Sequence, residues 1–242
     1  MAYELYYWPS IQGRGEFIRL ALEEAGADYV DVARGAEQDG QGMAAMMRLL
    51  NAPSAATPPF APPVLKDGEM VIGQTANILF YLGPRLGLSP ADEAGRLWTH
   101  QLQLTIGDLL VEVHDTHHPI GSGLYYEDQQ PESKRRSADF LAARAPKHLG
   151  YFETVLARNR AGPAHLAGAA LTYADLSLFQ IVEGLRYAFP KAMARLESAY
   201  PKVIALRDAI EARPRIKAYL ASPRRIAFNT QGIFRHYPEL DG

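Results

Sequence analysis

Two hydroxyl groups near the N-terminus, those of Tyr7 and Ser10, are the first candidates for chemistry in this sequence. They lie in YYWPSIQGRGEFIRL, where an aromatic run passes through a polar loop into a helix that opens with Gly13-Arg14-Gly15. A hydroxyl that donates a hydrogen bond to a ligand sulfur or oxygen favours the ionised form of that ligand. The first N–H groups of a helix are free donors, which favour an anion. We therefore expect a small anionic ligand at this junction, although a lone tyrosine at a strand end is more often a half-buried core residue.

A second group of candidates follows in FAPPVLKDGEMVIGQTANILFYL. Pro63 precedes a predicted strand, and a cis bond there would open the backbone edge at Val64 to an extended, peptide-like ligand. Gln74 and Thr75 stand where the next strand enters a helix. The Thr75 hydroxyl and the first N–H groups therefore form a candidate carboxylate site, with Asn77 as a further donor. Taken alone, a trans turn proline and ordinary helix caps explain these residues better than a binding site does.

These candidates belong to a region that alternates short strands with helices. The runs YELYY and DYVDV predict strands, PVLKDGEMVI predicts a hairpin around Asp67-Gly68, and helical spacing covers 14–25, 43–50 and a segment that begins at Thr75. The Gly/Ala/Pro-rich stretch between the second strand and the hairpin predicts a loop around the 43–50 helix. Beyond GPRLGLSPADE every segment has helical spacing, and we predict helices over 92–118, 132–160, 173–187, 200–213 and 214–220. The sequence thus predicts an α/β domain over residues 1–83 and an all-α domain over residues 92–242.

The sharpest local pattern in the second region is LTYADLSLF. Thr172 can accept a hydrogen bond from the N–H three residues on, and Asp175 can reach back to the Thr172 N–H, which makes a capping box. Leu171 and Leu176 form a hydrophobic staple across it. The helix that follows is apolar nearly all round and must be buried. The motif therefore predicts a structural role, and loss of the Asp175 carboxylate should cost on the order of 1 kcal/mol or more.

Composition excludes several classes of function. The chain has 242 residues, 48% of them hydrophobic, and 25 basic against 27 acidic residues, so no electrostatic footprint for nucleic acid or an anionic membrane is visible. No apolar run approaches the length of a membrane span, and MAYELYYWP lacks the basic and apolar regions of a signal peptide, so we expect a cytoplasmic protein. The absence of cysteine excludes disulfides, thiolate metal sites and an enzyme thiol nucleophile.

Three histidines, His114, His117 and His118, fall at i, i+3 and i+4 of one predicted helix. This spacing can bind zinc, but the HExxH pattern is missing and Asp115 is the one carboxylate beside them in sequence. We therefore expect a polar helix end and no metal site.

The order LYYWP, GRGEFIRL, APPVLKDGEMVIGQTANILFYL, LTYADLSLF and RPRIKAYLASP resembles the cytosolic glutathione transferase family, from Leu5 to about Pro223. The resemblance is greatest to the tyrosine-type classes alpha, mu and pi. It implies a thioredoxin-like N-terminal domain followed by a helical C-terminal domain, and a homodimer. It also implies a detoxifying transferase with glutathione as co-substrate, no metal, and a hydrophobic electrophile as the second substrate.

The resemblance also implies roles for individual residues. Tyr7 would stabilise the glutathione thiolate, with electrostatic help from Arg14. The backbone of Val64 would pair with the cysteinyl part of glutathione, and Gln74 and Thr75 would hold its glutamyl end. Further glutathione contacts would come from Trp8, Arg48 and Pro63. The electrophile pocket would include His118, Tyr125 and Phe228, with the polar tail lying across it as a flap or remaining a flexible end.

Two features of the sequence depart from the resembled family. The loop after Tyr7 is one residue longer than in the tyrosine classes, so Ser10 stays open as the donor. Gln12 stands where the beta class carries cysteine, and with no cysteine in the chain the cysteine-type mechanism is excluded. A low-turnover protein that binds glutathione or a hydrophobic ligand on the same scaffold is the alternative function, and a partner-binding module with a vestigial site is the third.

Overall fold

The computed structural model describes residues 2–52 and 56–242, so residues 53–55 of the predicted Gly/Ala/Pro-rich loop lie outside it. The chain begins with a four-stranded mixed sheet in the order β2-β1-β3-β4. Its strands are β1 (Tyr3–Tyr6), β2 (Tyr29–Asp31), β3 (Val64–Asp67) and β4 (Met70–Gly73). β1 pairs in parallel with β2 and antiparallel with β3, and the predicted hairpin joins β3 to β4.

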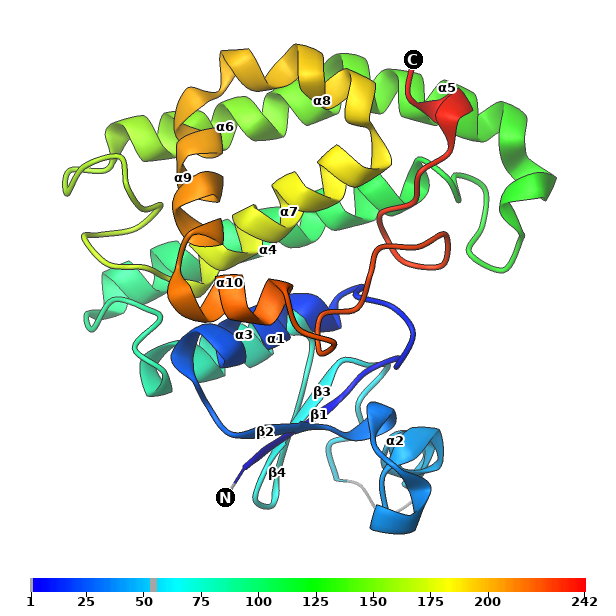
Figure 1. Cartoon of the computed structure of the whole chain (residues 1–242), viewed down its shortest axis with the longest axis vertical. Helices are drawn as coiled ribbons and strands as arrows, with labels where there is room; N and C mark the ends of the chain where they lie inside the picture. Colours follow the sequence, from blue (N-terminus) through cyan, green and yellow to red (C-terminus); the bar gives the residue numbers. More distant parts are fainter. Residues whose placement is uncertain (1, 53–55) are drawn as a thin grey trace.

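Alternation along the strands divides this region into two layers of apolar packing. Leu5 and Leu65 lie in the large core, whereas Tyr6 and Val64 face a smaller cluster formed with α2 (Gly42–Leu50). The other two helices of this region, α1 (Gly15–Ala25) and α3 (Thr75–Arg85), lie between the sheet and the helical region (Figure 1). The predicted order β-α-β-α-β-β-α is confirmed.

The rest of the chain is helical, as predicted. Its helices are α4 (Glu93–Asp115), α5 (Gln130–Asp139), α6 (Ala145–Arg158), α7 (Tyr173–Ala188), α8 (Pro190–Leu196), α9 (Pro201–Glu211) and α10 (Pro214–Leu220). The helix predicted over 132–160 is present as α5 and α6 joined by a π-helical turn, Phe140–Arg144. α7 is buried on nearly every side and packs against α1, α4 and α9.

One helix and one helix end differ from the prediction. The short helix α8 was not predicted. The helix predicted to reach His118 ends at Asp115. Thr116 is its C-cap residue, and the chain turns there. His117 and His118 consequently lie beyond the helix and not along its face.

The capping box at the start of α7 is present and fully buried. The Asp175 carboxylate accepts hydrogen bonds of 2.7 Å from the N–H of Thr172, from the Thr172 hydroxyl and from the N–H of Leu166. The bond to Leu166 was not predicted, since it comes from a loop outside the motif. Asp175 therefore fixes both the start of the central helix and the loop before it.

We expect Asp175→Ala to lower the free energy of unfolding by about 3 kcal/mol, because it removes the cap and leaves buried N–H groups without a partner. Asp92→Ala is the matched control, because Asp92 caps α4 by accepting one bond of 2.8 Å from the N–H of Gly95 at an exposed position. That change should cost about 1 kcal/mol or less. Urea unfolding of the two variants measures the difference, and equal losses would contradict the role assigned to Asp175.

The C-terminal tail, residues 221–242, is packed along the molecule. It leaves α10, passes the loop that precedes α1, and ends beside α5 and α8 (Figure 1). The side chain of Asn229 donates to the carbonyl of Ser10 at 2.8 Å, and the Asp241 carboxylate accepts from the N–H groups of Lys191 and Ala192 at the start of α8. The tail is therefore held by hydrogen bonds at Asn229 and at Asp241, and its role as a flap across the electrophile pocket stays a prediction.

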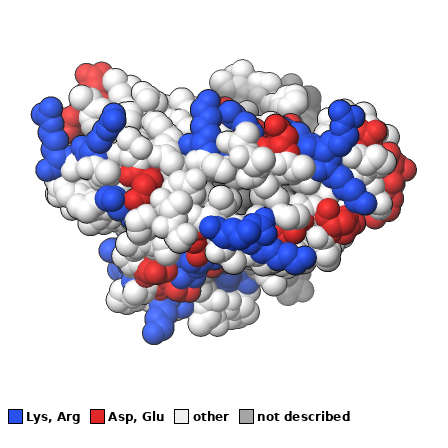
Figure 2. Space-filling view, turned by 90° about the horizontal axis from the view of Figure 1, so that it is seen from above, with Lys and Arg blue, Asp and Glu red and all other residues white. Residues whose placement is uncertain are grey.

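Among the described residues no helix is long and apolar enough to cross a membrane. On the face seen in Figure 2, Lys and Arg side chains are interspersed with Asp and Glu. That face therefore presents no broad surface of a single charge.

Candidate active site

Tyr7 follows the last residue of β1 and turns its ring toward the start of α1. Its side chain is 4% exposed, and its hydroxyl oxygen accepts a hydrogen bond of 2.8 Å from the backbone N–H of Arg14. The Tyr6 hydroxyl instead donates to Glu4, so alternation aims only one of the two phenols at the loop. Burial raises the pKa of Tyr7, and the phenol keeps its proton at neutral pH. That proton is available to a ligand, because the bond to Arg14 uses only a lone pair of the oxygen.

Gly13 and Gly15 make room for the Tyr7 ring. A Cβ at Gly13 would lie 2.1 Å from the Tyr7 hydroxyl oxygen, and one at Gly15 would lie 2.6 Å from the ring. Gly13 also has φ of +45°, in the left-handed region that favours glycine. The Gly13-Arg14-Gly15 motif thus holds the phenol against the start of the helix, a role that the sequence analysis did not assign.

The expectation of free N–H groups at this helix start is wrong at two positions. The N–H of Arg14 is bonded to Tyr7, and the N–H of Glu16 is bonded to the carbonyl of Gln12 at 3.0 Å. What the junction offers an anionic ligand is therefore the phenolic proton and the positive charge of Arg14. Within the described chain, the Arg14 guanidinium makes no hydrogen bond or ion pair, so it is free to turn toward a ligand.

The start of α3 lies directly beside this junction. The Thr75 hydroxyl approaches the Arg14 carbonyl at 3.5 Å, which joins the helix starts of α1 and α3. Gln74 is exposed, has φ of 71°, and its side chain makes no capping hydrogen bond within the part of the chain that the structure describes. Ordinary side-chain capping by Gln74 therefore does not account for this position. Asn77 uses its amide for the carbonyl of Gly73 at 3.3 Å.

The Pro62–Pro63 bond is cis, but it does not leave Val64 at an open edge. β3 is an inner strand, and Val64 is paired with Tyr6 of β1 on one side and with Gly73 of β4 on the other. The prediction of a free backbone edge at Val64 is therefore wrong, because neighbouring strands cover both sides. Any backbone contact with a peptide-like ligand must come from the segment before β3, where Pro62 and Pro63 have no N–H and can only accept.

Trp8 and Ser10 lie next to this junction, whereas Arg48 lies apart from it. Trp8 and Ser10 line a cavity of about 480 Å³ together with Met43 and with Gln231 of the tail. Arg48 is exposed on α2, and its guanidinium approaches the carbonyl of Gly40 at 3.5 Å. No contact connects Arg48 with Gln74 or Thr75 in the described chain, so its role as a glutathione contact stays a prediction.

The three residues predicted for the electrophile pocket lie in different surroundings. Phe228 stacks on Tyr187 with ring centroids 4.8 Å apart, and it borders a narrow cavity beside Gly13. His118 is buried in the histidine cluster described below. Tyr125 is 79% exposed on the turn before Tyr126–Gln129. Phe228 thus shares a cavity with the loop that holds Tyr7, and the pocket roles of all three residues stay predictions.

A polar network that sequence reasoning missed holds the tail against α1. The buried Glu16 carboxylate accepts from the Tyr219 hydroxyl at 2.6 Å and from the Arg225 guanidinium. Gln12 donates to the carbonyl of Ile226 at 2.5 Å and accepts from Gln180 at 2.7 Å. Single polar residues more than 160 positions apart leave no local pattern in the sequence. The network fixes the loop that carries Tyr7's partners.

Comparison with known proteins identifies similar sequences. Residues 114–223 match the family model described as "Glutathione S-transferase, C-terminal domain". The chain is 26% identical to "Glutathione S-transferase P" of Bos taurus over 225 residues, which cover 93% of this chain and 94% of the relative. It is 29% identical to "Glutathione S-transferase P 1" of Xenopus laevis over 223 residues, which cover 92% of this chain and 93% of the relative.

Solved structures show the same fold. A monomeric glutathione S-transferase from the hookworm Necator americanus superposes with a TM-score of 0.70 at 19% identity, over 94% of this chain and all of that one. The fold is therefore a thioredoxin-like α/β region followed by a helical domain. The chain is thus similar to glutathione S-transferases over nearly its whole length, and its C-terminal region matches their family model.

Proposed function

We propose that this protein is a glutathione transferase that joins the glutathione sulfur to hydrophobic electrophiles. The observation that carries the proposal is the Tyr7 hydroxyl, which is buried, held by the N–H of Arg14, and left with its own proton to donate. A thiolate placed against that proton is stabilised relative to the thiol. One pKa unit corresponds to about 1.4 kcal/mol, so one preorganised donor can bring a thiol pKa of about 8.5 toward neutrality.

Glutathione would lie from the Tyr7 junction toward the start of α3. Its sulfur would accept from Tyr7, and the positive charge of the Arg14 guanidinium would stabilise the negative charge. Its glutamyl carboxylate would meet the Thr75 hydroxyl and the first N–H groups of α3, where Gln74 leaves the helix start without a side-chain cap. The thiolate then attacks an electrophilic carbon, a C–S bond forms, and the leaving group departs with the bonding electrons.

Turnover of a chlorodinitrobenzene-type substrate with glutathione tests the proposal. We expect a rate well above the uncatalysed reaction, saturable in glutathione. Glutathione affinity measured by calorimetry without any rate above background would support the alternative of a low-turnover binding protein. If neither turnover nor glutathione binding is measured, only the assignment of the fold would stand. In the proposed role the protein removes reactive electrophiles in the cytoplasm.

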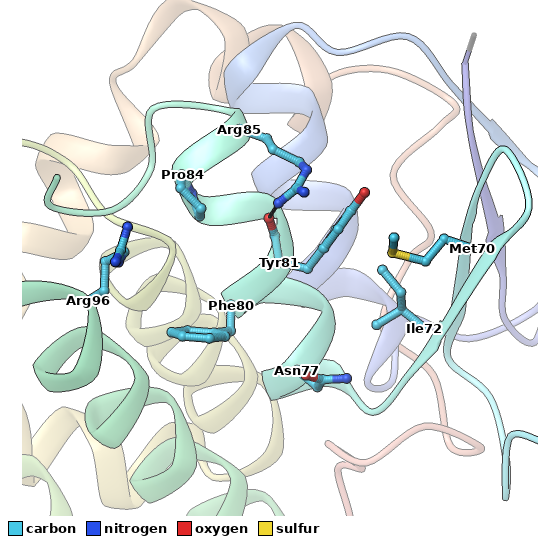
Figure 3. Close-up of a pocket in the computed structure, with 8 residues that line it drawn as sticks. All are labelled: Met70, Ile72, Asn77, Phe80, Tyr81, Pro84, Arg85 and Arg96. Atoms are coloured by element: carbon cyan, nitrogen blue, oxygen red, sulfur yellow. Dashed lines mark hydrogen bonds between the residues drawn. The ribbon is translucent and has the colours of Figure 1, made fainter. Parts of the chain in front are cut away.

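We also propose that the protein works as a homodimer. This proposal is supported by an apolar surface on the described part of the chain, which a monomer would leave exposed to solvent. Phe60 is 97% exposed, and Leu97, Leu104 and Val111 form an exposed stripe at seven-residue spacing along α4. Beside α4 lies an apolar cavity of about 480 Å³, built on α3 with Met70 and Ile72 of β4 and Arg96 of α4 (Figure 3). A second copy, with its own Phe60, is the occupant that this surface fits.

We expect Leu104→Arg and Phe60→Ser each to convert a dimer into a monomer, because each removes apolar area from the centre of the proposed interface. Met47→Arg changes another exposed apolar residue, on α2, and should leave the dimer intact. Light scattering coupled to gel filtration measures the mass of each variant. A monomeric wild-type protein, like the Necator americanus neighbour, would contradict the dimer proposal. It would not contradict the proposed transferase activity.

A further inference from the structure

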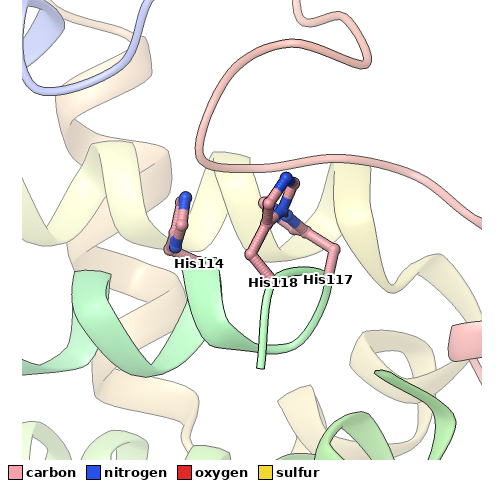
Figure 4. A group of neighbouring side chains, drawn as sticks. All are labelled: His114, His117 and His118. Carbon is pink, nitrogen blue, oxygen red and sulfur yellow. The ribbon is translucent and has the colours of Figure 1, made fainter. Parts of the chain in front are cut away.

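Three imidazoles meet where α4 ends. His114 lies in the last turn of α4, and His117 and His118 follow on the turn beyond it, so that all three rings rise toward the tail (Figure 4). One ring nitrogen from each histidine lies within 4.8 Å of the others. The ring centroids are 4.7 to 5.1 Å apart. The end of the helix at Asp115 produces this cluster, because the turn brings His118 back over His117.

Each of two rings has a partner that fixes which nitrogen faces the cluster. The Nε2 of His117 is 2.8 Å from the carbonyl of Ile233, which can only accept, so Nε2 carries the proton and Nδ1 is a free lone pair. The Nδ1 of His114 is 3.5 Å from the Asp115 carboxylate, which favours a proton on Nδ1 and leaves Nε2 unprotonated. Histidines that bind metals are oriented in this way by a carbonyl or carboxylate behind the ring.

The Nδ1 atoms of His117 and His118 face each other at 2.5 Å. Since Nδ1 of His117 has a lone pair, one proton on His118 must lie between them. Burial lowers the pKa of His117 to about 3 and that of His118 to about 4, and it lowers the pKa of His114 as well. All three rings are thus neutral at physiological pH, the form in which imidazole binds a metal.

We propose that His114, His117 and His118 form a binding site for one divalent transition-metal ion of the class that prefers imidazole, with Zn²⁺ as its probe. The ion takes the place of the proton between the two Nδ1 atoms, and the His118 ring, which stays neutral, takes up a proton on its Nε2 by exchange with solvent. Zinc–nitrogen bonds of about 2.0–2.1 Å in a tetrahedral site place two nitrogens roughly 3.3 Å apart, so the His118 ring must rotate away from His117. Three protein ligands leave a fourth position for water or another small ligand.

The charges around the cluster are mixed in sign. Asp115 and Glu127 are the carboxylates near it, and Arg14 and Arg235 are the cations. The two signs balance, so the surroundings neither repel nor strongly attract a divalent ion. His117 is fully buried, whereas His114 is partly open to solvent and gives the ion a path of entry.

Calorimetric titration of the untagged, chelator-treated protein with Zn²⁺ tests the proposal, without glutathione because its thiol binds zinc. We expect one equivalent to bind, and Co²⁺ to give the strong visible absorption of a tetrahedral site. His114→Gln and His118→Gln should each weaken Zn²⁺ binding by at least the 10- to 100-fold that loss of an outer partner costs. Circular dichroism melting of both variants checks that they fold.

His165→Gln is the matched control, because His165 lies beside Asp175 at the start of α7. It should leave Zn²⁺ affinity within about twofold, since it removes none of the three ligands. Zinc bound with equal affinity by all of these proteins would mean an adventitious surface ion and overturn the site, as would no binding at all. Because the histidines do not touch Tyr7, loss of the metal site would not by itself argue against the transferase proposal.

Discussion

Replacement of Tyr7 by phenylalanine should lower the turnover of a chlorodinitrobenzene-type substrate by roughly 10²-fold, the cost of removing one donor to a developing negative charge. Glutathione affinity should change little, because the hydroxyl acts on the ionised sulfur and the glutamyl end binds elsewhere. Steady-state kinetics with calorimetry separates the two effects, since the loss belongs in kcat and not in the dissociation constant. A loss confined to binding would contradict the role assigned to the phenol.

The pH profile of the Tyr7→Phe variant is an independent test of whether the Tyr7 hydroxyl lowers the pKa of the bound thiol. In the wild-type protein the bound thiol should ionise near neutrality. The kcat/KM for the electrophile, measured at saturating glutathione, should therefore rise with pH and level off there. Without the donor the thiol pKa moves back toward about 8.5, so the variant recovers part of its rate at alkaline pH. Because burial raises the pKa of Tyr7, the wild-type phenol keeps its proton across this range and no alkaline loss from its ionisation is expected.

Ser10→Ala is the control for the rival donor. Ser10 is exposed, and its carbonyl accepts from Asn229 of the tail. We expect this variant to keep nearly full activity and an unchanged pH profile. If Ser10→Ala shows the loss and Tyr7→Phe does not, the donor has been assigned to the wrong residue.

Local patterns in the sequence predicted most of the fold. Asp67-Gly68 predicted the hairpin, the 3.6-residue period predicted α1 and α7, and the Thr172–Asp175 pair predicted the buried start of α7. Each of these signals lies within a few residues of the structure that it specifies. The domain limits of 1–83 and 92–242 stay predictions.

What the sequence could not predict depends on residues far apart in the chain. The hairpin signal places β4 on one side of Val64, but nothing local reveals that β1 covers the other side, so Val64 was predicted to lie at an open edge. Glu16 meets Tyr219 and Arg225 across about 200 residues, and no period or motif marks such a contact. The spacing of the three histidines was visible in the sequence, but their arrangement was not, because the helix ends at Asp115, three residues earlier than predicted.

Replacement of Gly13 by alanine should be nearly as damaging to turnover as loss of the phenol itself. The added Cβ would lie 2.1 Å from the Tyr7 hydroxyl oxygen, closer than two atoms can approach, so the ring or the loop must move. Because productive geometry tolerates errors of only about 0.5 Å, we expect roughly a 10²-fold loss of kcat with the side chain of Tyr7 still present.

The matched control for Gly13→Ala is Gly87→Ala. Gly87 has φ of +68°, so alanine there carries a similar left-handed backbone cost of about 1 kcal/mol, but no atom of the described residues lies within 4 Å of the new Cβ. Unfolding experiments should show that both variants lose stability, and kinetics should show that only Gly13→Ala loses turnover. Equal activity losses would mean that backbone strain and not displacement of Tyr7 is responsible. Glycine at position 13 would then serve the fold alone, and the phenol would not depend on it for its position.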